Sequence, residues 1–119
     1  MIIQSFLTIQ NQIKILHWQT KSYAKHQALG SAYESLDALI DSFVETFAGL
    51  DRKILELDSC VTKCKSINSL DIMEFMKSVS DFLSTKLDSY IPEGRSDLHN
   101  IKDEMIAVVN KTMYLLRLD

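Results

Sequence analysis

The sequence contains very few residues that interrupt a helix. Among its 119 residues there are one proline and three glycines. No long stretch alternates between apolar and polar residues either, and that alternation is the pattern of a half-buried strand. Because proline and glycine are the strongest signals for turns and breaks, their scarcity disfavours β structure and favours helix throughout the chain.

Excess basic charge and long hydrophobic runs are also lacking. The formal net charge is −3, which argues against a nucleic-acid binder that works by broad phosphate neutralisation. Residues 1–6 lack the basic region and apolar run of a signal peptide. No stretch approaches the ~18–20 apolar residues of a membrane span. We therefore expect a cytoplasmic protein that has no contact with a membrane and no basic tail for DNA.

Cysteine is nearly absent, with Cys60 and Cys64 as the two examples. On a helix, residues four apart would share a face. However, neither histidine nor further cysteine stands nearby, so a structural zinc site is not expected. We interpret the pair as free thiols in a connecting segment.

The remaining composition is that of an ordinary globular protein, with 46% hydrophobic and 24% charged residues, and the length suits one domain over residues 1–119. Apolar residues at spacings of three and four predict helices over 2–20, 23–48, 71–90 and from 96 onward. The expected core positions are Ile2, Phe6, Ile9, Ile13 and Leu16; Leu29, Ala32, Tyr33, Leu36, Ile40, Phe43 and Phe47; Ile72, Phe75, Met76, Val79, Phe82, Leu83 and Leu87; and Leu98, Ile101, Met105, Val108, Thr112 and Leu115.

The first helix is apolar on more than one side. Ile3, Leu7, Ile15 and Trp18 lie off its main stripe. In so small a domain, another subunit is the natural cover for this extra apolar surface. We therefore expect a homo-oligomer.

The connections predict how the four helices are arranged. A short turn, with Ser22 as helix cap, separates the first two helices, and residues 91–94 form a turn before the last, which Ser96 is expected to cap. Gly49 is the expected end of the second helix. Residues 50–68, with a short helical piece at 51–57, form a long link that suits a crossover between two parallel helices. The sequence thus predicts an all-α, ferritin-like four-helix bundle with a crossover between its second and third helices.

Two histidines and three acids are candidate metal ligands. His17 ends the first helix and His26 opens the second, whereas Glu34, Asp41 and Glu45 lie on the face of the second helix opposite its core stripe. Imidazole and carboxylate groups together suit divalent transition metals. On their own, however, such histidines are more often capping or interface residues, and an acidic stripe is more often a solvated helix face.

Helix geometry requires two copies of the chain for a shared ion. His26 and Asp41 are fifteen residues apart on one helix, about 22 Å at 1.5 Å per residue. An antiparallel pair of second helices would bring His26 of one copy level with Asp41 and Glu45 of the other, with the two-fold axis near Glu34. Such a contact makes two equivalent sites per dimer.

The spacing of these residues resembles that of the Dps family, the miniferritins of the ferritin-like superfamily. His17 and Trp18 match its His-Trp pair, and His26 is followed by Asp41 after fifteen residues and by Glu45 after nineteen. The chain also resembles short ferritin-like proteins of large DNA viruses and phages, which would place it in a host cytoplasm.

The resemblance implies Fe(II) binding and oxidation by peroxide or oxygen between subunits, for iron storage or protection from oxidative damage. His17, His26, Asp41 and Glu45 would be the ligands, with iron as the metal or zinc in its place. Self-association would be as a two-fold dimer or a dodecameric cage.

Gly30 departs from the family pattern, in which a further metal-binding Asp typically stands at this position. Two histidines and two carboxylates then remain for each site, enough for one transition ion, and Glu34 is a candidate substitute. The alternative is a ferritin-like bundle with a degenerate metal site that acts as a structural or partner-binding oligomer. Trp18 is interpreted as a packing residue.

Overall fold

The computed structural model describes residues 2–118 and is all-helical, with no strand among those residues. Three long α-helices are α1 (Ile2–Gln19), α2 (Tyr23–Leu50) and α5 (Ser96–Leu116). The fourth helical run consists of α3 (Ile72–Phe82), the π turn η3 (Leu83–Leu87) and α4 (Asp88–Tyr90), which follow one another without a break. Two short 3₁₀ helices, η1 (Arg52–Leu55) and η2 (Ile67–Ser69), flank the long connection. The all-α prediction is confirmed.

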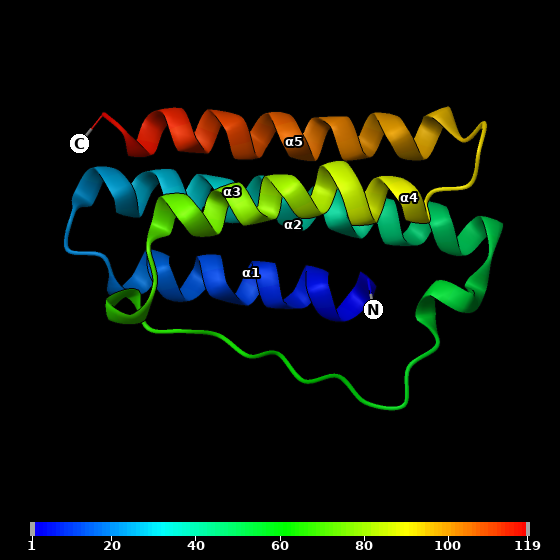
Figure 1. The fold of residues 1–119 in the computed structure, drawn as a ribbon, viewed down its shortest axis with the longest axis horizontal. Helices are drawn as coiled ribbons and strands as arrows, with labels where there is room; N and C mark the ends of the chain where they lie inside the picture. The colour runs from blue at the N-terminus through cyan, green and yellow to red at the C-terminus, as the bar shows by residue number, and fades with distance from the viewer. Residues whose placement is uncertain (1, 119) are drawn as a thin grey trace.

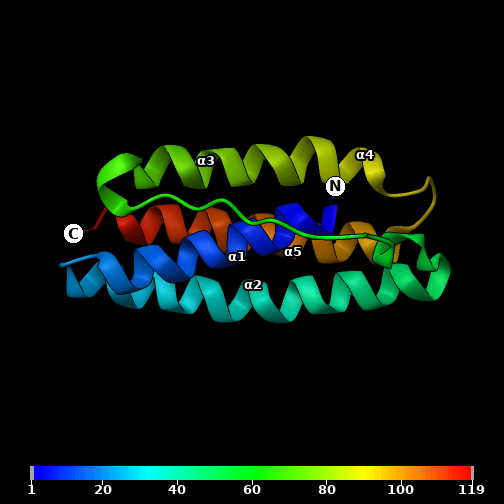
Figure 2. The same ribbon diagram turned by 90° about the horizontal axis from the view of Figure 1, so that it is seen from below.

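The four helical runs lie side by side along the longest axis of the molecule (Figures 1 and 2). α1 and α2 form an antiparallel hairpin, and α2 and α3 run in the same direction. Between these two parallel helices the chain returns along the whole length of the bundle, and α5 then runs antiparallel to both. The long crossover expected from the sequence is therefore present between α2 and α3.

Helix α2 is central to the packing, since it lies against α1 on one side and α5 on the other. Phe6 of α1 contacts Phe43 of α2 and Phe82 of α3 edge to face, with ring centroids 5.7 and 6.1 Å apart. Most of the core positions expected in the first three helices are buried. In the last helix, Leu98, Met105 and Thr112 are buried as expected. The expected positions Ile101, Val108 and Leu115 are only partly buried, and the residue after each of them, Lys102, Val109 and Leu116, is buried.

Capping interactions explain where the helices begin. The side chain of Ser22 accepts a hydrogen bond from the backbone N–H of Lys25, as expected from the sequence. The side chain of Asp71 accepts one from the backbone N–H of Glu74 in the same way. Ser96 does not cap α5, because it is the first residue inside the helix and Arg95 occupies the cap position.

The expected end of the second helix at Gly49 is wrong. Among the described residues Gly94 is the glycine with a positive φ, of 83°; Gly49 keeps a helical conformation. The helix therefore continues to Leu50. Asp51 ends it, and the Asp51 side chain then accepts a hydrogen bond from the backbone N–H of Lys53 at the start of η1.

Candidate metal-ligating residues

His17 and His26 form a stacked pair where the α1–α2 hairpin closes. Their rings are 3.9 Å apart between centroids and 14° from parallel. Nδ1 of His17 lies 2.7 Å from the backbone oxygen of His26, and Nδ1 of His26 lies 2.8 Å from the backbone oxygen of His17. The short turn between the helices thus brings together both histidines that the sequence singled out.

The hydrogen bonds of this pair fix the tautomer of each ring. A carbonyl oxygen can only accept, so each Nδ1 must carry the proton and donate it. In the neutral imidazole the other nitrogen, Nε2, then carries the lone pair. A metal-bound histidine usually has this arrangement, with one ring nitrogen on the metal and the other donating to a carbonyl or carboxylate. Both rings are therefore in the tautomer that can bind a metal ion through Nε2.

Gly30 provides the space that the ring of His17 occupies. A Cβ atom at position 30 would lie 2.8 Å from Cε1 and 3.0 Å from Nδ1 of His17, closer than unbonded carbon atoms approach. A larger residue at this position, including an Asp, would require the His17 ring to move. The absence of the additional carboxylate is thus coupled to the stacking of the two histidines.

Asp41 and Glu45 form a second group, one turn apart on the exposed face of α2. A hydrogen bond with Asp41 and repulsion by its charge raise the pKa of Glu45. Two carboxylates that repel each other in this way are a ready partner for a cation, because a cation relieves the repulsion. Glu34 is exposed on the same helix, closer to the histidines.

The structure does not bring the histidines and the acids together within one chain. Among residues 2–118, no group of three or more His, Cys, Asp or Glu side chains could hold a metal ion. The acids lie further along α2 than the histidine pair, as the helix arithmetic requires. A site that uses both groups therefore needs a second copy of the chain.

The exposed side of the α1–α2 hairpin combines apolar and charged groups. Trp18 is 68% exposed and Leu7 is 40% exposed. Lys14 places its ammonium group 4.5 Å from the ring centre of Tyr33 and 5.6 Å from that of Trp18. Trp18 is thus not a core residue of the single chain, as its position off the main apolar stripe of the first helix suggested.

A shallow groove of about 280 Å³ lies between α1 and α2, beside the acid pair. Its walls include Leu7, Val44 and Asp41, together with Gln10, which donates a hydrogen bond of 2.7 Å to Asp37. Gln10 is buried although it is polar. This pair was not predicted from the sequence. The signal that could have found it is the position of Gln10, four residues after Phe6 and three before Ile13, on a buried side of the helix.

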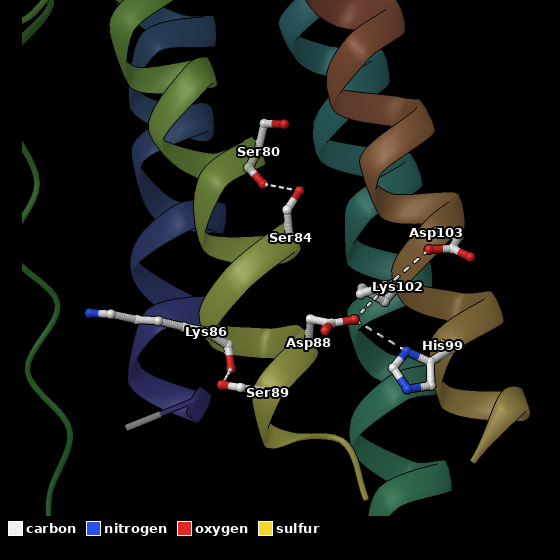
Figure 3. Close-up of polar contacts among 8 residues, drawn as sticks. All are labelled: Ser80, Ser84, Lys86, Asp88, Ser89, His99, Lys102 and Asp103. Atoms are coloured by element: carbon white, nitrogen blue, oxygen red, sulfur yellow. Dashed lines mark hydrogen bonds and ion pairs between the residues drawn. The ribbon is translucent and has the colours of Figure 1, made fainter. Parts of the chain in front are cut away.

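An ion pair between α4 and α5 was also missed (Figure 3). Nζ of Lys102 lies 2.7 Å from Oδ1 of Asp88 and 3.3 Å from Oδ1 of Asp103, and Nδ1 of His99 lies 3.4 Å from the same Asp88 oxygen. The hydrogen bond from Lys102 lowers the pKa of Asp88 and raises that of Lys102. This cluster already contains its own cation, so it joins two helices and does not suit a metal ion.

The cysteines lie in the crossover and not on a helix, so they do not share a helical face. Both are free thiols and half-buried. The Cys64 thiol lies 3.8 Å from the backbone oxygen of Thr8 in α1, and burial raises its pKa.

The fold and these groups define a class of protein: an all-helical bundle of four helical runs, with a histidine pair at one end of α2 and an acid pair in the opposite half. Residues 17–116 match a family model described as a family of unknown function, DUF5856. Because this match covers most of the chain, the protein belongs to that family. All five candidate ligands lie in the matched span. No curated protein and no solved structure matches the chain. None of the helices in the described part of the chain could cross a membrane.

Proposed function

We propose that the protein is a Dps-like, ferritin-like protein that binds Fe(II) between two antiparallel copies of the chain and oxidises it. The observation that carries the proposal is the stacked histidine pair, in which each Nδ1 donates to the other residue's carbonyl group. This arrangement holds both imidazoles in a metal-binding tautomer before any metal arrives. The long crossover between the parallel helices α2 and α3 supports the ferritin-like assignment.

The distribution of charge along α2 supports the antiparallel arrangement. Lys25 and His26 lie in its first turn, whereas Asp37, Asp41 and Glu45 lie in its second half. Cations at a helix N-terminus oppose the helix dipole and cost about 0.3–1 kcal/mol each at low salt. Two such helices side by side in opposite directions would place the basic start of each beside the acidic half of the other.

Each site in such a dimer would have a defined set of donors. His17 and His26 of one copy would supply two nitrogen atoms, and Asp41 and Glu45 of the other would supply carboxylate oxygens. This mixed donor set suits divalent iron and also zinc. Bound Fe(II) would give an electron to peroxide or oxygen, and the product would be ferric iron for storage, with less Fe(II) left for radical chemistry.

A second candidate function is a structural or partner-binding oligomer that holds a single ion without efficient oxidation. The observation that favours it is Gly30, since the ring of His17 fills the space that a further carboxylate would need. Two-iron chemistry then lacks one anionic ligand, unless Glu34 of either copy supplies it. Zinc would serve this function as well as iron.

Mass measurement in solution combined with anaerobic Fe(II) titration tests the proposal. We expect a dimer or a larger even-numbered assembly that binds about one iron per chain, followed by oxidation when peroxide or air is admitted. The variant His26→Ala should weaken iron binding by at least about tenfold, since it removes one ligand and one of the two reciprocal hydrogen bonds.

His99→Ala is the matched control, because His99 lies at the α4–α5 ion pair, away from the hairpin. It should bind iron as the wild type does. A monomer that takes up no iron, or equal loss in both variants, would contradict the proposal. Iron binding without oxidation would favour the second candidate function.

A further inference from the structure

The extended part of the crossover, residues 56–66, is held along α1 by side chains of that helix; we call it the crossover strap. Gln12 makes two hydrogen bonds with Lys65, since its Oε1 accepts from the Lys65 N–H at 2.7 Å and its Nε2 donates to the Lys65 oxygen at 2.8 Å. Asn11 donates to the Thr62 hydroxyl at 3.2 Å. Just beyond the strap, Oε1 of Gln19 accepts from the Ile67 N–H at 2.7 Å.

The strap alternates its side chains as a β-strand does, although no strand pairs with it among the described residues. Cys60, Thr62 and Cys64 are half-buried, and the residues between them, Val61 and Lys63, are exposed. Both thiols are thus on the buried side of the strap. Cys64 is the one placed against α1, at the Thr8 carbonyl.

The extended conformation keeps the two thiols from reacting with each other. Four residues of extended chain at about 3.3 Å each separate their Cα atoms by roughly 13 Å. A disulfide needs Cα atoms within about 4.4–6.8 Å of each other. A Cys60–Cys64 disulfide therefore requires the strap to fold back on itself, which is incompatible with its attachment to α1.

We propose that Cys60 and Cys64 are an oxidation site, and that the disulfide between them releases the crossover strap from α1. Attachment of the strap to α1 and a Cys60–Cys64 disulfide exclude each other. The free energy by which attachment disfavours the disulfide therefore equals the free energy by which the disulfide disfavours attachment. Loss of the Gln12–Lys65 hydrogen bonds makes disulfide formation easier, and disulfide formation breaks those bonds. This inference does not depend on the proposed metal site.

Hydrogen peroxide is an oxidant that completes the reaction. Because burial raises the pKa of the Cys64 thiol, Cys64 is the poorer first nucleophile. The Cys60 thiolate attacks one peroxide oxygen, the O–O bond breaks, and water leaves after protonation to give a sulfenic acid at Cys60. After the strap detaches, the Cys64 thiolate attacks that sulfur, the S–S bond forms and a second water leaves. Two thiols lose two electrons, and one peroxide gains them.

Release of the strap would open the side of the bundle between α1 and α3. A groove of about 380 Å³ lies there, lined by Thr8 and Ile9 of α1 and by Phe75, Val79 and Phe82 of α3. A neighbouring hollow of about 420 Å³ shares Thr8 and Phe75 and is walled by Lys63 and Lys65 of the strap. Figure 1 shows the strap on the outer side of α1. Oxidation would thus remove the wall that Lys63 and Lys65 of the strap give to the second hollow.

The test treats the full-length reduced protein with hydrogen peroxide and follows disulfide formation by mass spectrometry without reductant. Hydrogen exchange of the Lys65 and Ile67 amides reports attachment of the strap, because each donates to a glutamine of α1. We expect an intramolecular disulfide and at least roughly tenfold faster exchange at both amides in the oxidised protein. In Cys60→Ser, peroxide should leave the exchange rates unchanged.

Variants of the attachment test the coupling in the opposite direction. Gln12→Ala removes two hydrogen bonds and should speed disulfide formation roughly tenfold. Asn11→Ala removes one and, because Asn11 is exposed, leaves the core intact; it should speed the reaction a few-fold. Gln27→Ala is the matched control, since Gln27 is an exposed glutamine of α2 that bonds Tyr23, and its reaction should keep the wild-type rate.

Three results would overturn the inference. The first is an oxidised protein whose Lys65 and Ile67 amides exchange as slowly as in the reduced form. The second is a disulfide that forms only between two chains. The third is a disulfide that forms no faster in Gln12→Ala and Asn11→Ala than in Gln27→Ala.

Discussion

At the scale of single residues, Gly30 decides how the two histidines meet. His17 reaches across the hairpin and lies over the backbone of α2 at this glycine. Its ring then stacks on His26 with both Nδ1 atoms bonded to backbone oxygens. Glycine in a helix costs about 1 kcal/mol relative to alanine. This close approach is the physical reason for a glycine at position 30.

Gly30→Ala should separate the effect on the histidines from the effect on helix stability. The added Cβ must displace the His17 ring, because the contact of 2.8 Å is too short. We expect the ring stacking to be lost, with metal affinity lower by at least about tenfold, as for loss of an oriented ligand. The free energy of unfolding should change by less than about 1 kcal/mol, since improved helix propensity offsets the lost hydrogen bonds. Imidazole proton chemical shifts, metal titration and urea unfolding measure these effects.

Gly49→Ala is the control for this variant. A Cβ at position 49 meets no other atom within 4 Å, and the position lies in the same helix. It should raise stability by a few tenths up to about 1 kcal/mol and leave the histidine signals unchanged. If Gly30→Ala behaved in the same way as Gly49→Ala, the stacked arrangement of the histidines would be wrong.

At the scale of elements, an ion pair that follows the π turn of the third helical run connects this run to α5. Ser84 and Thr85 in the π turn donate hydrogen bonds to the backbone oxygens of Ser80 and Asp81, one turn earlier. Asp88 follows the π turn and points toward Lys102 and His99 of α5 (Figure 3). Lys102 is buried within the α5 core face, where an unpaired charge would be costly, and the carboxylates of Asp88 and Asp103 balance it.

This ion pair predicts how stability depends on pH. The pKa of Asp88 is lowered in the folded state, so its contribution is present above the ordinary pKa and is lost as pH falls below about 4. The pKa of Lys102 is raised, so its contribution is present below the ordinary lysine pKa and is lost as pH rises above about 10.5. Lys102→Met should therefore lower the free energy of unfolding at neutral pH. In this variant the free energy of unfolding should also fall less below pH about 4 and above pH about 10.5 than in the wild type.

Urea unfolding across the pH range measures this effect, with Lys86→Met as the control. Lys86 is an exposed lysine of the same π turn that makes no ion pair among the described residues. Its variant should keep the wild-type pH profile. Equal profiles for Lys102→Met and the wild type would show that the ion pair contributes nothing to stability.

The helices themselves were predictable in most respects. Residue spacing identified the buried faces of α1 and α2, because a helix packed on one side needs an apolar residue every three or four positions. The end of α2 was not predictable from Gly49, since a glycine ends a helix only if the chain there turns into the left-handed conformation. Gly49 does not adopt the left-handed conformation, so α2 continues to Leu50 and ends at its cap residue, Asp51.

At the scale of the whole molecule, charge is unevenly distributed along the bundle. In α5, Asp97, Asp103 and Glu104 lie in the first half, whereas Lys111 and the following Arg117 lie at the end. Because α5 runs antiparallel to α2 (Figure 1), the acidic halves of both helices lie at the same end of the molecule. The net charge of −3 is thus the sum of a basic half and an acidic half of the bundle.

Self-association of the proposed dimer should therefore depend on salt. Opposite halves would meet in an antiparallel pair, and their attraction is screened as the Debye length falls from about 10 Å at 0.1 M to about 3 Å at 1 M. We expect the dissociation constant to rise at least about tenfold over this range in sedimentation experiments. Lys21→Glu, in the hairpin turn, should weaken association, whereas Lys77→Glu, on α3, should not. Association that strengthens with salt would contradict the antiparallel pairing.

The sequence by itself determined the helical fold, the order of the helices, the crossover and the separation of the histidines from the acids. These follow from local spacing and from the fixed rise of a helix, which need no knowledge of distant contacts. Only the tertiary structure decided that His17 stacks on His26 over Gly30, that Lys102 is neutralised by Asp88, and that the cysteines lie on an extended strap. Each of these depends on how two helices meet across a turn or on the path of a loop, which local periodicity does not specify.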